Sequence, residues 1–177
     1  ADLAANISLV GTDDTNGIYG SSTHDVLMGL GANDYLNGYE GDDTLIGGTG
    51  NDYLVGNLGS DAYIFNLGDG QDTISQYEYY GNPYKDRLVF GEGINASEIV
   101  FYRDSYDGRN LIITIKGSTD SITVLQYYDD QTFYGLDAIE FADGTVWTAT
   151  QIADLAATVG LVGDNNNNWI YGSASNE

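Results

Sequence analysis

Aspartate recurs at nine-residue intervals through the first third of the chain, and carboxylates at this spacing could bind a hard cation. When the sequence is written in rows of nine from Thr12, one acidic column appears. It contains Asn16, Asp25, Asp34, Asp43, Asp52 and Asp61. Residues 1–84 hold 13 carboxylates and neither Lys nor Arg, so the column would repel itself unless cations neutralised it. Carboxylate and carbonyl oxygens suit Ca²⁺ rather than a soft transition metal.

Residues for acid–base or nucleophilic catalysis are scarce. The chain has no Cys, which excludes disulfides and Cys-ligated zinc or iron–sulfur sites. The single His, His24, occupies a turn position of its row, with no second His to share a zinc ion and no Ser-His-Asp set. We therefore expect that the protein is not an enzyme.

The same rows predict the elements that position the acidic column. An apolar residue follows each acidic position by two places, and Gly closes five of the six rows. Each row is expected to form a six-residue turn and a three-residue strand whose middle residue points inward. Two rows then complete one coil of a solenoid, so residues 18 apart stack on the same side. The inward residues are Ile18, Leu27, Leu36, Leu45, Leu54 and Tyr63.

Residues 47–55 read GGTGNDYLV and match the pattern GGxGxDxUx in full, while residues 38–46 are a near match. In these motifs the chain resembles the RTX (haemolysin-type) calcium-binding nonapeptide repeats. The resemblance implies an all-β fold that begins with a parallel β-roll, a calcium-bound solenoid, over residues 12–65. It also implies that each Ca²⁺ lies between turns 18 residues apart, and that the Asp of a middle turn, here Asp43, bridges two ions.

The resemblance assigns carbonyl oxygens as well as carboxylates to these calcium sites. The implied carboxylate pairs are Asp25/Asp43, Asp43/Asp61 and Asp34/Asp52. For the Asp34/Asp52 ion the implied carbonyl donors are Leu30, Ala32, Gly47 and Thr49. For the Asp43/Asp61 ion they are Tyr39, Gly41, Gly56 and Leu58. Three Ca²⁺ ions are expected, and up to five if Asn16/Asp34 and a pair of Asp52 with Asp69 or Asp72 also bind.

After Phe65 the nine-residue period stops, and the sequence predicts strands joined by hairpin turns. The expected strands are 88–90, 99–103, 110–116, 121–125, 138–141 and 145–148. Thr148 and Gln151 form a capping-box pattern, which predicts one short C-terminal helix over 151–160. Segments between residues 68 and 147 resemble the haemolysin-type calcium-binding related domain, so a β-rich cap is expected over 66–150.

The two ends of the chain resemble each other. Residues 1–11 and 153–163 are identical at eight of eleven positions, at a shift of 152 residues. The match continues where both segments read IYGS, at residues 18–21 and 170–173. We therefore expect residues 1–11 to be the end of a preceding unit or a linker, and residues 161–177 to begin the next unit of a tandem array.

The net charge of −22 limits the partners, because all five basic residues lie within residues 85–116. Neither nucleic acid nor an anionic membrane surface is expected to bind, and no apolar run is long enough to insert into a membrane. The expected partners are Ca²⁺ and adjacent repeat units of the parent chain. The RTX resemblance implies a protein secreted by the type I route, extracellular or on the cell surface.

The interpretation that follows is a non-catalytic structural module that folds on extracellular Ca²⁺. The alternative is a carbohydrate-binding or adhesive module, in which tyrosines of the loops around residues 77–84 and 127–134 stack on a glycan. Ice binding would need a ladder of Thr and Asn in two turn columns, and only Thr49 with Asn51 fits that pattern.

Overall fold

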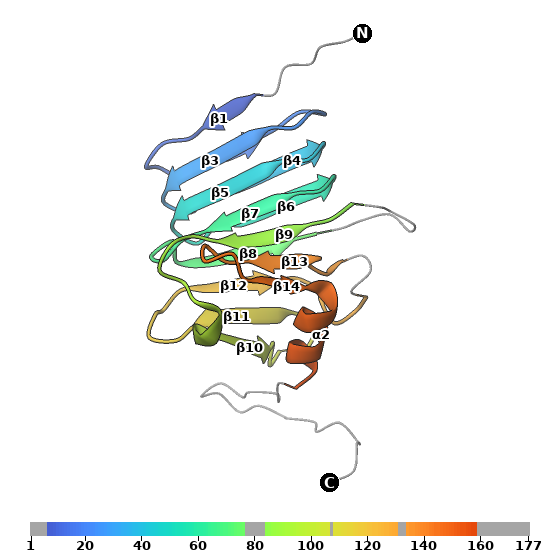
Figure 1. The fold of residues 1–177 in the computed structure, drawn as a ribbon. Coiled ribbons are helices and arrows are strands. Elements are labelled where there is room, and N and C mark those ends of the chain that lie inside the picture. The colour runs from blue at the N-terminus through green and yellow to red at the C-terminus, as the bar shows by residue number, and fades with distance from the viewer. Residues whose placement is uncertain (1–6, 77–83, 107, 131–133, 159–177) are drawn as a thin grey trace.

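Two seven-stranded sheets face each other in the computed structural model, which describes residues 7–76, 84–106, 108–130 and 134–158 (Figure 1). The order in sheet A is β1 (Ser8–Val10), β3 (Val26–Gly31), β5 (Thr44–Thr49), β7 (Ala62–Phe65), β9 (Arg87–Phe90), β13 (Ala138–Glu140) and β14 (Val146–Thr148). The order in sheet B is β10 (Ile99–Arg103), β11 (Leu111–Ile115), β12 (Ser121–Val124), β8 (Gln71–Ser75), β6 (Tyr53–Leu58), β4 (Tyr35–Glu40) and β2 (Gly17–Tyr19).

Strands of the roll are parallel and pair with the strand two rows away. Leu27 of β3 pairs with Leu45 of β5, and Leu36 of β4 pairs with Leu54 of β6. Successive rows alternate between the sheets, because each turn carries the chain from one sheet to the other. Two rows therefore make one coil, which confirms the parallel β-roll predicted from the nine-residue period.

The inward apolar column forms the core of the roll. Leu27, Leu36 and Leu45 are completely buried, and Leu54 and Tyr63 nearly so. Each buried leucine contributes about 1.5–3 kcal/mol relative to an exposed one. Apolar packing between the sheets is thus continuous from coil to coil.

The strands are longer than the sequence pattern predicts. Strands β3 to β6 each span six residues where three were expected. The parallel ladder continues past the closing Gly of each row, as the pairs Leu30↔Gly48 and Tyr39↔Asn57 show. Half of each expected turn is therefore strand, because stacked turns of equal length also pair with one another.

Both sheets continue past Phe65. In sheet A, β9 pairs in parallel with β7, and in sheet B, β12 pairs in parallel with β8. Antiparallel pairs of β10 with β11, β11 with β12 and β13 with β14 then complete the sheets. The later strands thus extend the sheets of the roll and share one hydrophobic core with it.

A short helix, α2 (Ala149–Ala157), packs against β10, β13 and β14 at the end of the roll (Figure 1). Thr148 and Gln151 form the predicted capping box at its start, and Ile152 and Ala156 are buried. A 3₁₀ turn, η1 (Ala96–Glu98), precedes β10. The helix begins two residues before the predicted start, because the two residues directly after the Thr148 cap are already helical.

Candidate metal centre

The aspartates of the acidic column lie where a turn passes into the next strand, at the level where stacked turns meet. We define the first column as the residues that precede β3, β5 and β7, namely Asp25, Asp43 and Asp61. The second column comprises Asn16, Asp34 and Asp52, which precede β2, β4 and β6, and Asp72, which is the second residue of β8. The two columns belong to the turns that lead into sheets A and B, respectively.

Hydrogen bonds to the main chain hold each column together. The Oδ1 atom of one residue accepts a hydrogen bond from the backbone N–H of the member before it. In the first column the N···O distances are 2.7 Å from Asp25 to Asp43 and 2.8 Å from Asp43 to Asp61. In the second column they are 2.7 Å from Asp34 to Asp52 and 3.0 Å from Asp52 to Asp72. The carboxylates are thereby stacked one per coil.

The other carboxylate oxygen, Oδ2, has no hydrogen-bond partner in Asp34, Asp43, Asp52 and Asp72. All four side chains are buried. A buried polar atom without a partner costs about 1–3 kcal/mol, and a charged one costs more. Each of these oxygens therefore requires either a proton or a bound cation.

Burial disfavours the charged form of these groups. Burial and the neighbouring Asp25 carboxylate raise the pKa of Asp43 to about 6. Burial and the neighbouring carboxylates Asp34 and Asp69 raise the pKa of Asp52 to about 6. Burial, together with the carboxylates of Asp52, Asp69 and Asp120, raises the pKa of Asp72 to about 8. A divalent cation would remove both the desolvation cost and the repulsion between carboxylates.

The turns adopt a backbone conformation that L-residues rarely use. In five successive turns, 29–34, 38–43, 47–52, 56–61 and 67–72, the residues at the second and fourth positions of the GGxGxD pattern have positive φ. At the second position these residues are Leu30, Tyr39, Gly48, Asn57 and Gly68. At the fourth position they are Ala32, Gly41, Gly50, Gly59 and Gly70. Positive φ at Leu30, Ala32 and Tyr39 is a backbone cost, and such costs concentrate at functional sites.

The carbonyl oxygens of these positions face the next turn of their own column. A Cβ atom placed on Gly50 would lie 2.0 Å from Ala32 O, and one placed on Gly59 would lie 1.9 Å from Gly41 O. Only Gly fits at these two contacts. The predicted donors Ala32 and Gly41 therefore do direct their carbonyls between turns 18 residues apart.

A carboxylate oxygen and a predicted carbonyl converge beside the Gly that closes a row. A Cβ atom placed on Gly29 would lie 2.3 Å from Asp34 Oδ2 and 2.4 Å from Gly47 O. The same construction on Gly48 meets Leu30 O at 2.2 Å. The turns 29–34 and 47–52 thus place the Asp34 carboxylate near the Gly47 carbonyl, and the carbonyls of Leu30 and Ala32 against Gly48 and Gly50 of the later turn.

The remaining predicted donors lie in the same stacked turns. Leu58 O accepts a hydrogen bond of 2.8 Å from Gly41 N, so one of its lone pairs is used by the main chain. Thr49 lies opposite Gly31 at the end of the β3–β5 ladder. Gly56 lies against Asp61, whose Oδ2 would be 2.1 Å from a Cβ atom placed there.

Asp25 differs from the other aspartates, because side chains of its own turn occupy its oxygens. Its Oδ2 accepts hydrogen bonds from Ser21 N at 2.7 Å and Ser21 Oγ at 2.8 Å. Its Oδ1 accepts from Ile7 N at 3.0 Å and Thr23 Oγ1 at 3.2 Å. Burial would raise the pKa of Asp25, but these hydrogen bonds outweigh burial and lower it. Asp25 therefore suits a closed turn better than an ion site.

Asn16 closes the second column in the same way. Its Oδ1 accepts a hydrogen bond of 2.6 Å from Thr12 N, and its Nδ2 donates to Thr12 Oγ1 at 3.2 Å. Its backbone N–H donates to Asp34 Oδ1 at 2.7 Å. The first residue of each column is thus hydrogen-bonded to uncharged protein groups.

At the other end of the second column, the carboxylate that accepts the Asp52 N–H belongs to Asp72. The Asp69 side chain instead accepts a hydrogen bond of 2.7 Å from Asn66 N, while Asp69 O accepts one of 2.7 Å from Gly50 N. Residues 67–72 read LGDGQD and repeat the spacing of the GGxGxD turn. The sequence signal for Asp72 was therefore present, displaced by a two-residue insertion.

The first column also continues beyond the nine-residue rows. Asp61 N donates to Asp86 Oδ1 at 2.8 Å, and Gln76 Nε2 donates to Asp86 Oδ2 at 2.8 Å. Asp86 N in turn donates to Asp137 Oδ2 at 3.2 Å, and Lys85 Nζ lies 2.7 Å from Asp137 Oδ1. At this end of the column, N–H groups, an amide and one lysine are the partners of the carboxylates.

Side chains alone do not form a metal cluster within the described ranges, where no three His, Cys, Asp or Glu residues come together. A site between two turns must therefore combine two carboxylates with main-chain carbonyls. Such a set is typical of Ca²⁺, which accepts six to eight oxygen ligands, and unlike sites for transition metals. The residues present thus fit the ion that the sequence predicts.

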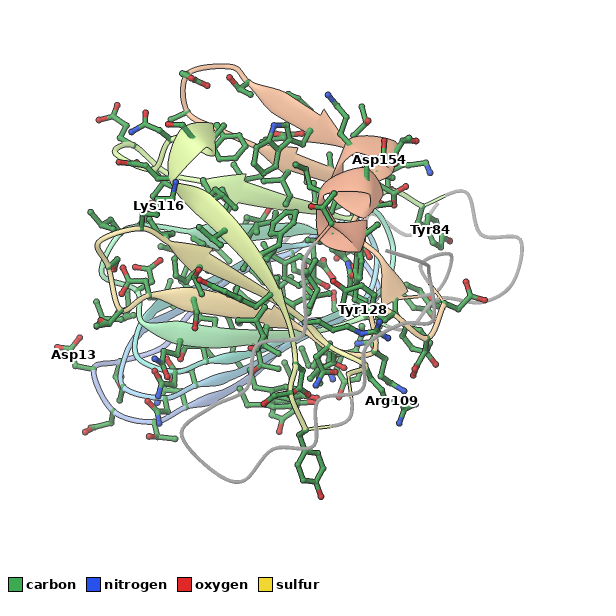
Figure 2. All side chains as sticks on the ribbon, turned by 90° about the horizontal axis from the view of Figure 1, so that it is seen from below. Asp13, Tyr84, Arg109, Lys116, Tyr128 and Asp154 are labelled. Carbon is green, nitrogen blue, oxygen red and sulfur yellow. The ribbon has the colours of Figure 1, made fainter. Side chains whose placement is uncertain are left out.

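The tyrosines proposed to bind a glycan are partly structural. Tyr127 is buried, and the Tyr128 ring lies 4.4 Å from the Arg103 guanidinium carbon. The Tyr128 hydroxyl also donates to Ala156 O at 3.1 Å, which ties the loop to α2. Figure 2 shows Tyr128 at this end of the molecule, beside the helix. Residues 77–83 lie outside the described residues.

Fold and site together define an acidic parallel β-roll whose turns offer oxygen ligands to a hard divalent cation. By sequence, the chain carries RTX calcium-binding nonapeptide repeats followed by a haemolysin-type calcium binding protein related domain. The nonapeptide family matches residues 10–45, 19–54, 28–63, 37–74 and 161–177, and the related domain matches residues 110–151.

A similar fold occurs in the AlgE6R3 subunit of the mannuronan C5-epimerase from Azotobacter vinelandii. The TM-score is 0.52 at 23% sequence identity, over 89% of this chain and 91% of that chain. No curated protein sequence matches the chain. Among the described residues, no helix is long and apolar enough to cross a membrane.

Without calcium, the roll is expected to become less stable as pH rises. The folded-state pKa values of about 6 for Asp43 and Asp52 and about 8 for Asp72 exceed the unfolded value of 3.8. Protonation therefore stabilises the fold fully below pH 3.8, and this stabilisation is lost as pH rises through 6 and 8. Thermal unfolding in chelator should show a midpoint that falls as pH rises from 5, until the roll is largely unfolded above neutral pH. With saturating Ca²⁺ the fall should shrink or reverse, because Ca²⁺ displaces these protons; a flat profile in chelator would contradict the assignment.

Replacing Asp72 should affect calcium binding more than replacing Asp69. Asp72→Asn removes a column carboxylate, whereas Asp69→Asn keeps the main-chain carbonyl that the turn uses. We expect Asp72→Asn to lower the number of bound ions by one in calorimetric titration, and Asp69→Asn to leave it unchanged. The reverse ranking would place the ligand at Asp69.

Proposed function

We propose that this protein is a non-catalytic module whose β-roll folds when it binds Ca²⁺. The observation that carries the proposal is the set of buried Oδ2 atoms without partners in Asp34, Asp43, Asp52 and Asp72. No Lys or Arg occurs in residues 7–76 to neutralise them. The repeat family supplies the identity of the cation, and the stacked carbonyls are its expected ligands.

Three ions fit the two columns best. The pair Asp34/Asp52 has orphaned oxygens, positive φ and inward carbonyls on the earlier turn, and the pairs Asp43/Asp61 and Asp52/Asp72 share this backbone. The pair Asp25/Asp43 is the poorest candidate, because four hydrogen bonds already satisfy Asp25. Asp52 then becomes the carboxylate that bridges two ions, in place of the expected Asp43.

Binding of this kind can decide whether the roll folds. An ion present at ten times its Kd contributes about 1.4 kcal/mol, so three ions contribute about 4 kcal/mol. This is comparable to the whole stability of a small domain. Extracellular calcium modules have Kd values near 10⁻⁴–10⁻³ M, so the roll would stay unfolded in a low-calcium cytosol and close outside the cell.

The proposed setting is a large secreted protein with several such units in tandem. The internal repeat of 152 residues supports this, and so does the separate match of the nonapeptide family to residues 161–177. Those residues lie outside the described part of the chain. Type I secretion is the route typical of RTX proteins, and adjacent units of the same chain would be the natural partners.

Calcium should induce β structure in the chain, whereas Mg²⁺ should not. Mg²⁺ releases its water reluctantly and is a poor match for a site built from carbonyls. Above neutral pH, where the column carboxylates lose their protons, far-UV circular dichroism and amide exchange of residues 12–75 should report a largely unfolded segment in chelator and a protected one at millimolar Ca²⁺. Equal protection in both conditions would contradict calcium-driven folding.

Asp52→Asn should cost more calcium-dependent stability than Asp25→Asn. Asp52 serves two proposed ions, so its loss should remove about 2–3 kcal/mol of the calcium contribution, measured as the difference in unfolding free energy with and without Ca²⁺. Asp25→Asn should lower the stability in both conditions alike, since its bonds are made without an ion. Equal calcium-dependent losses would refute the bridging position.

A further inference from the structure

The outer face of sheet B carries a stack of tyrosines that the calcium site does not use. We call it the tyrosine face and define it by Tyr19 of β2, Tyr35 and Asn37 of β4, and Tyr53 and Asn57 of β6. The inward neighbours of these residues, such as Leu36 and Leu54, are the core. Side chains alternate across a strand, so the tyrosines point to solvent.

The rings form one continuous row across three strands. Tyr35 and Tyr53 stack with their ring centroids 5.7 Å apart and their planes 10° apart. The Tyr19 ring centroid lies 5.8 Å from that of Tyr35. These separations are those of offset rings, which leave part of each face uncovered. Tyr19 remains 53% exposed and Tyr53 37%, although each contacts another ring or strand.

Polar groups beside the rings are held in place. Asn37 Nδ2 donates to the Tyr35 hydroxyl at 3.2 Å, and Asn57 Nδ2 donates to Asn37 Oδ1 at 2.7 Å. Tyr39 N also donates to Asn37 Oδ1, at 3.1 Å. A rigid surface of this kind loses little conformational entropy when a ligand binds.

The tyrosine face is uncharged in a strongly acidic protein. The outward residues of β2, β4, β6 and β8 are Gly17, Tyr19, Tyr35, Asn37, Tyr39, Tyr53, Val55, Asn57, Gln71, Thr73 and Ser75. The net charge of −22 around this face would repel an anionic polymer. The face also lacks carboxylates that would pair with a cationic peptide.

The outer face of sheet A provides a contrast. Its register row Val10, Met28, Ile46, Ile64 and Val89 is aliphatic and has no hydrogen-bonding side chain. Nothing in the structure shows what would cover that row. The tyrosine face differs because aromatic surface and amide or hydroxyl groups occur together.

We propose that the tyrosine face binds an extended, uncharged polysaccharide, which lies along the row of Tyr19, Tyr35 and Tyr53. The C–H surface of a pyranose ring gains from burial against an aromatic ring, while its hydroxyls need amide and hydroxyl partners nearby. The row crosses three strands that lie about 4.8 Å apart, so the row is roughly 10 Å long and exceeds the length of one sugar ring. An uncharged chain also avoids the surrounding acidic surface.

The proposal is separate from the calcium function, but the face exists only on a folded roll. Binding should therefore be measured in saturating Ca²⁺, and each variant should first be shown to keep the calcium-dependent thermal midpoint of the parent. Tyr35→Thr/Tyr53→Thr is a suitable double variant, because Thr73 already occupies the same register row and Thr suits a strand. Tyr106→Thr is the matched control, since Tyr106 is 95% exposed in the β10–β11 hairpin, away from the face.

Affinity electrophoresis through gels containing hydroxyethyl cellulose, dextran or polygalacturonate tests the proposal. The parent and Tyr106→Thr should be retarded by at least one of the two uncharged polymers and not by polygalacturonate. The double variant should lose at least tenfold in affinity with its calcium response intact. Retardation by none of the uncharged polymers, retardation by polygalacturonate alone, or equal retardation of the double variant would overturn the proposal. So would a concentration-dependent dimer that the double variant abolishes, because the face would then belong to a second copy of the chain.

Discussion

The stacking of buried carboxylates is the constraint on which the rest of this roll depends. Parallel pairing at a shift of 18 residues places the aspartates of successive coils in register, with each Oδ1 on a main-chain N–H. That bond fixes the carboxylate but leaves Oδ2 buried and unpaired in the middle of the columns. Because desolvation and like charges both oppose ionisation there, the ionised fold needs a cation.

The unusual turn backbone follows from the same constraint. A hard cation between two turns needs more oxygens than two carboxylates provide, and main-chain carbonyls of the same turns are a ready source. Positive φ at the second and fourth positions turns those carbonyls toward the next coil. Leu30 and Ala32 adopt it as well, although this backbone conformation is strained for residues with a Cβ atom. The close contact of Ala32 O with Gly50 shows why the later turn keeps Gly at that position, although the earlier turn does not.

The ends of the columns show how the chain stops this arrangement. At the start, Asn16 with Thr12 and Asp25 with Ser21 replace ionic partners with neutral hydrogen bonds. At the far end of the first column, Gln76 donates to Asp86, and Lys85 pairs with Asp137. Of the remaining basic residues, Arg87 and Arg103 lie on β9 and β10, and Arg109 and Lys116 flank β11. Figure 2 shows Arg109 and Lys116 far apart, and Arg109 pairs with Asp129. The buried carboxylate oxygens without a protein partner thus lie between these two ends.

The sequence by itself determined the roll, its 18-residue stacking, its inward leucines and the aspartate columns, because an uninterrupted nine-residue period admits only one register. The capping box of α2 and most later strands were equally local signals. The sequence left Asp69 and Asp72 both open, and the tertiary structure decided for Asp72, whose carboxylate accepts the Asp52 N–H. Insertions of two and seven residues shift the sequence phase of the two columns, while the hydrogen-bonded ladder restores it. The tertiary structure also decided that Ser21, Thr23 and Ile7 donate hydrogen bonds to Asp25, and that tyrosines from alternate rows meet on one face. These features depend on which groups are neighbours in the folded structure, and the spacing of residues along the chain does not determine those neighbours.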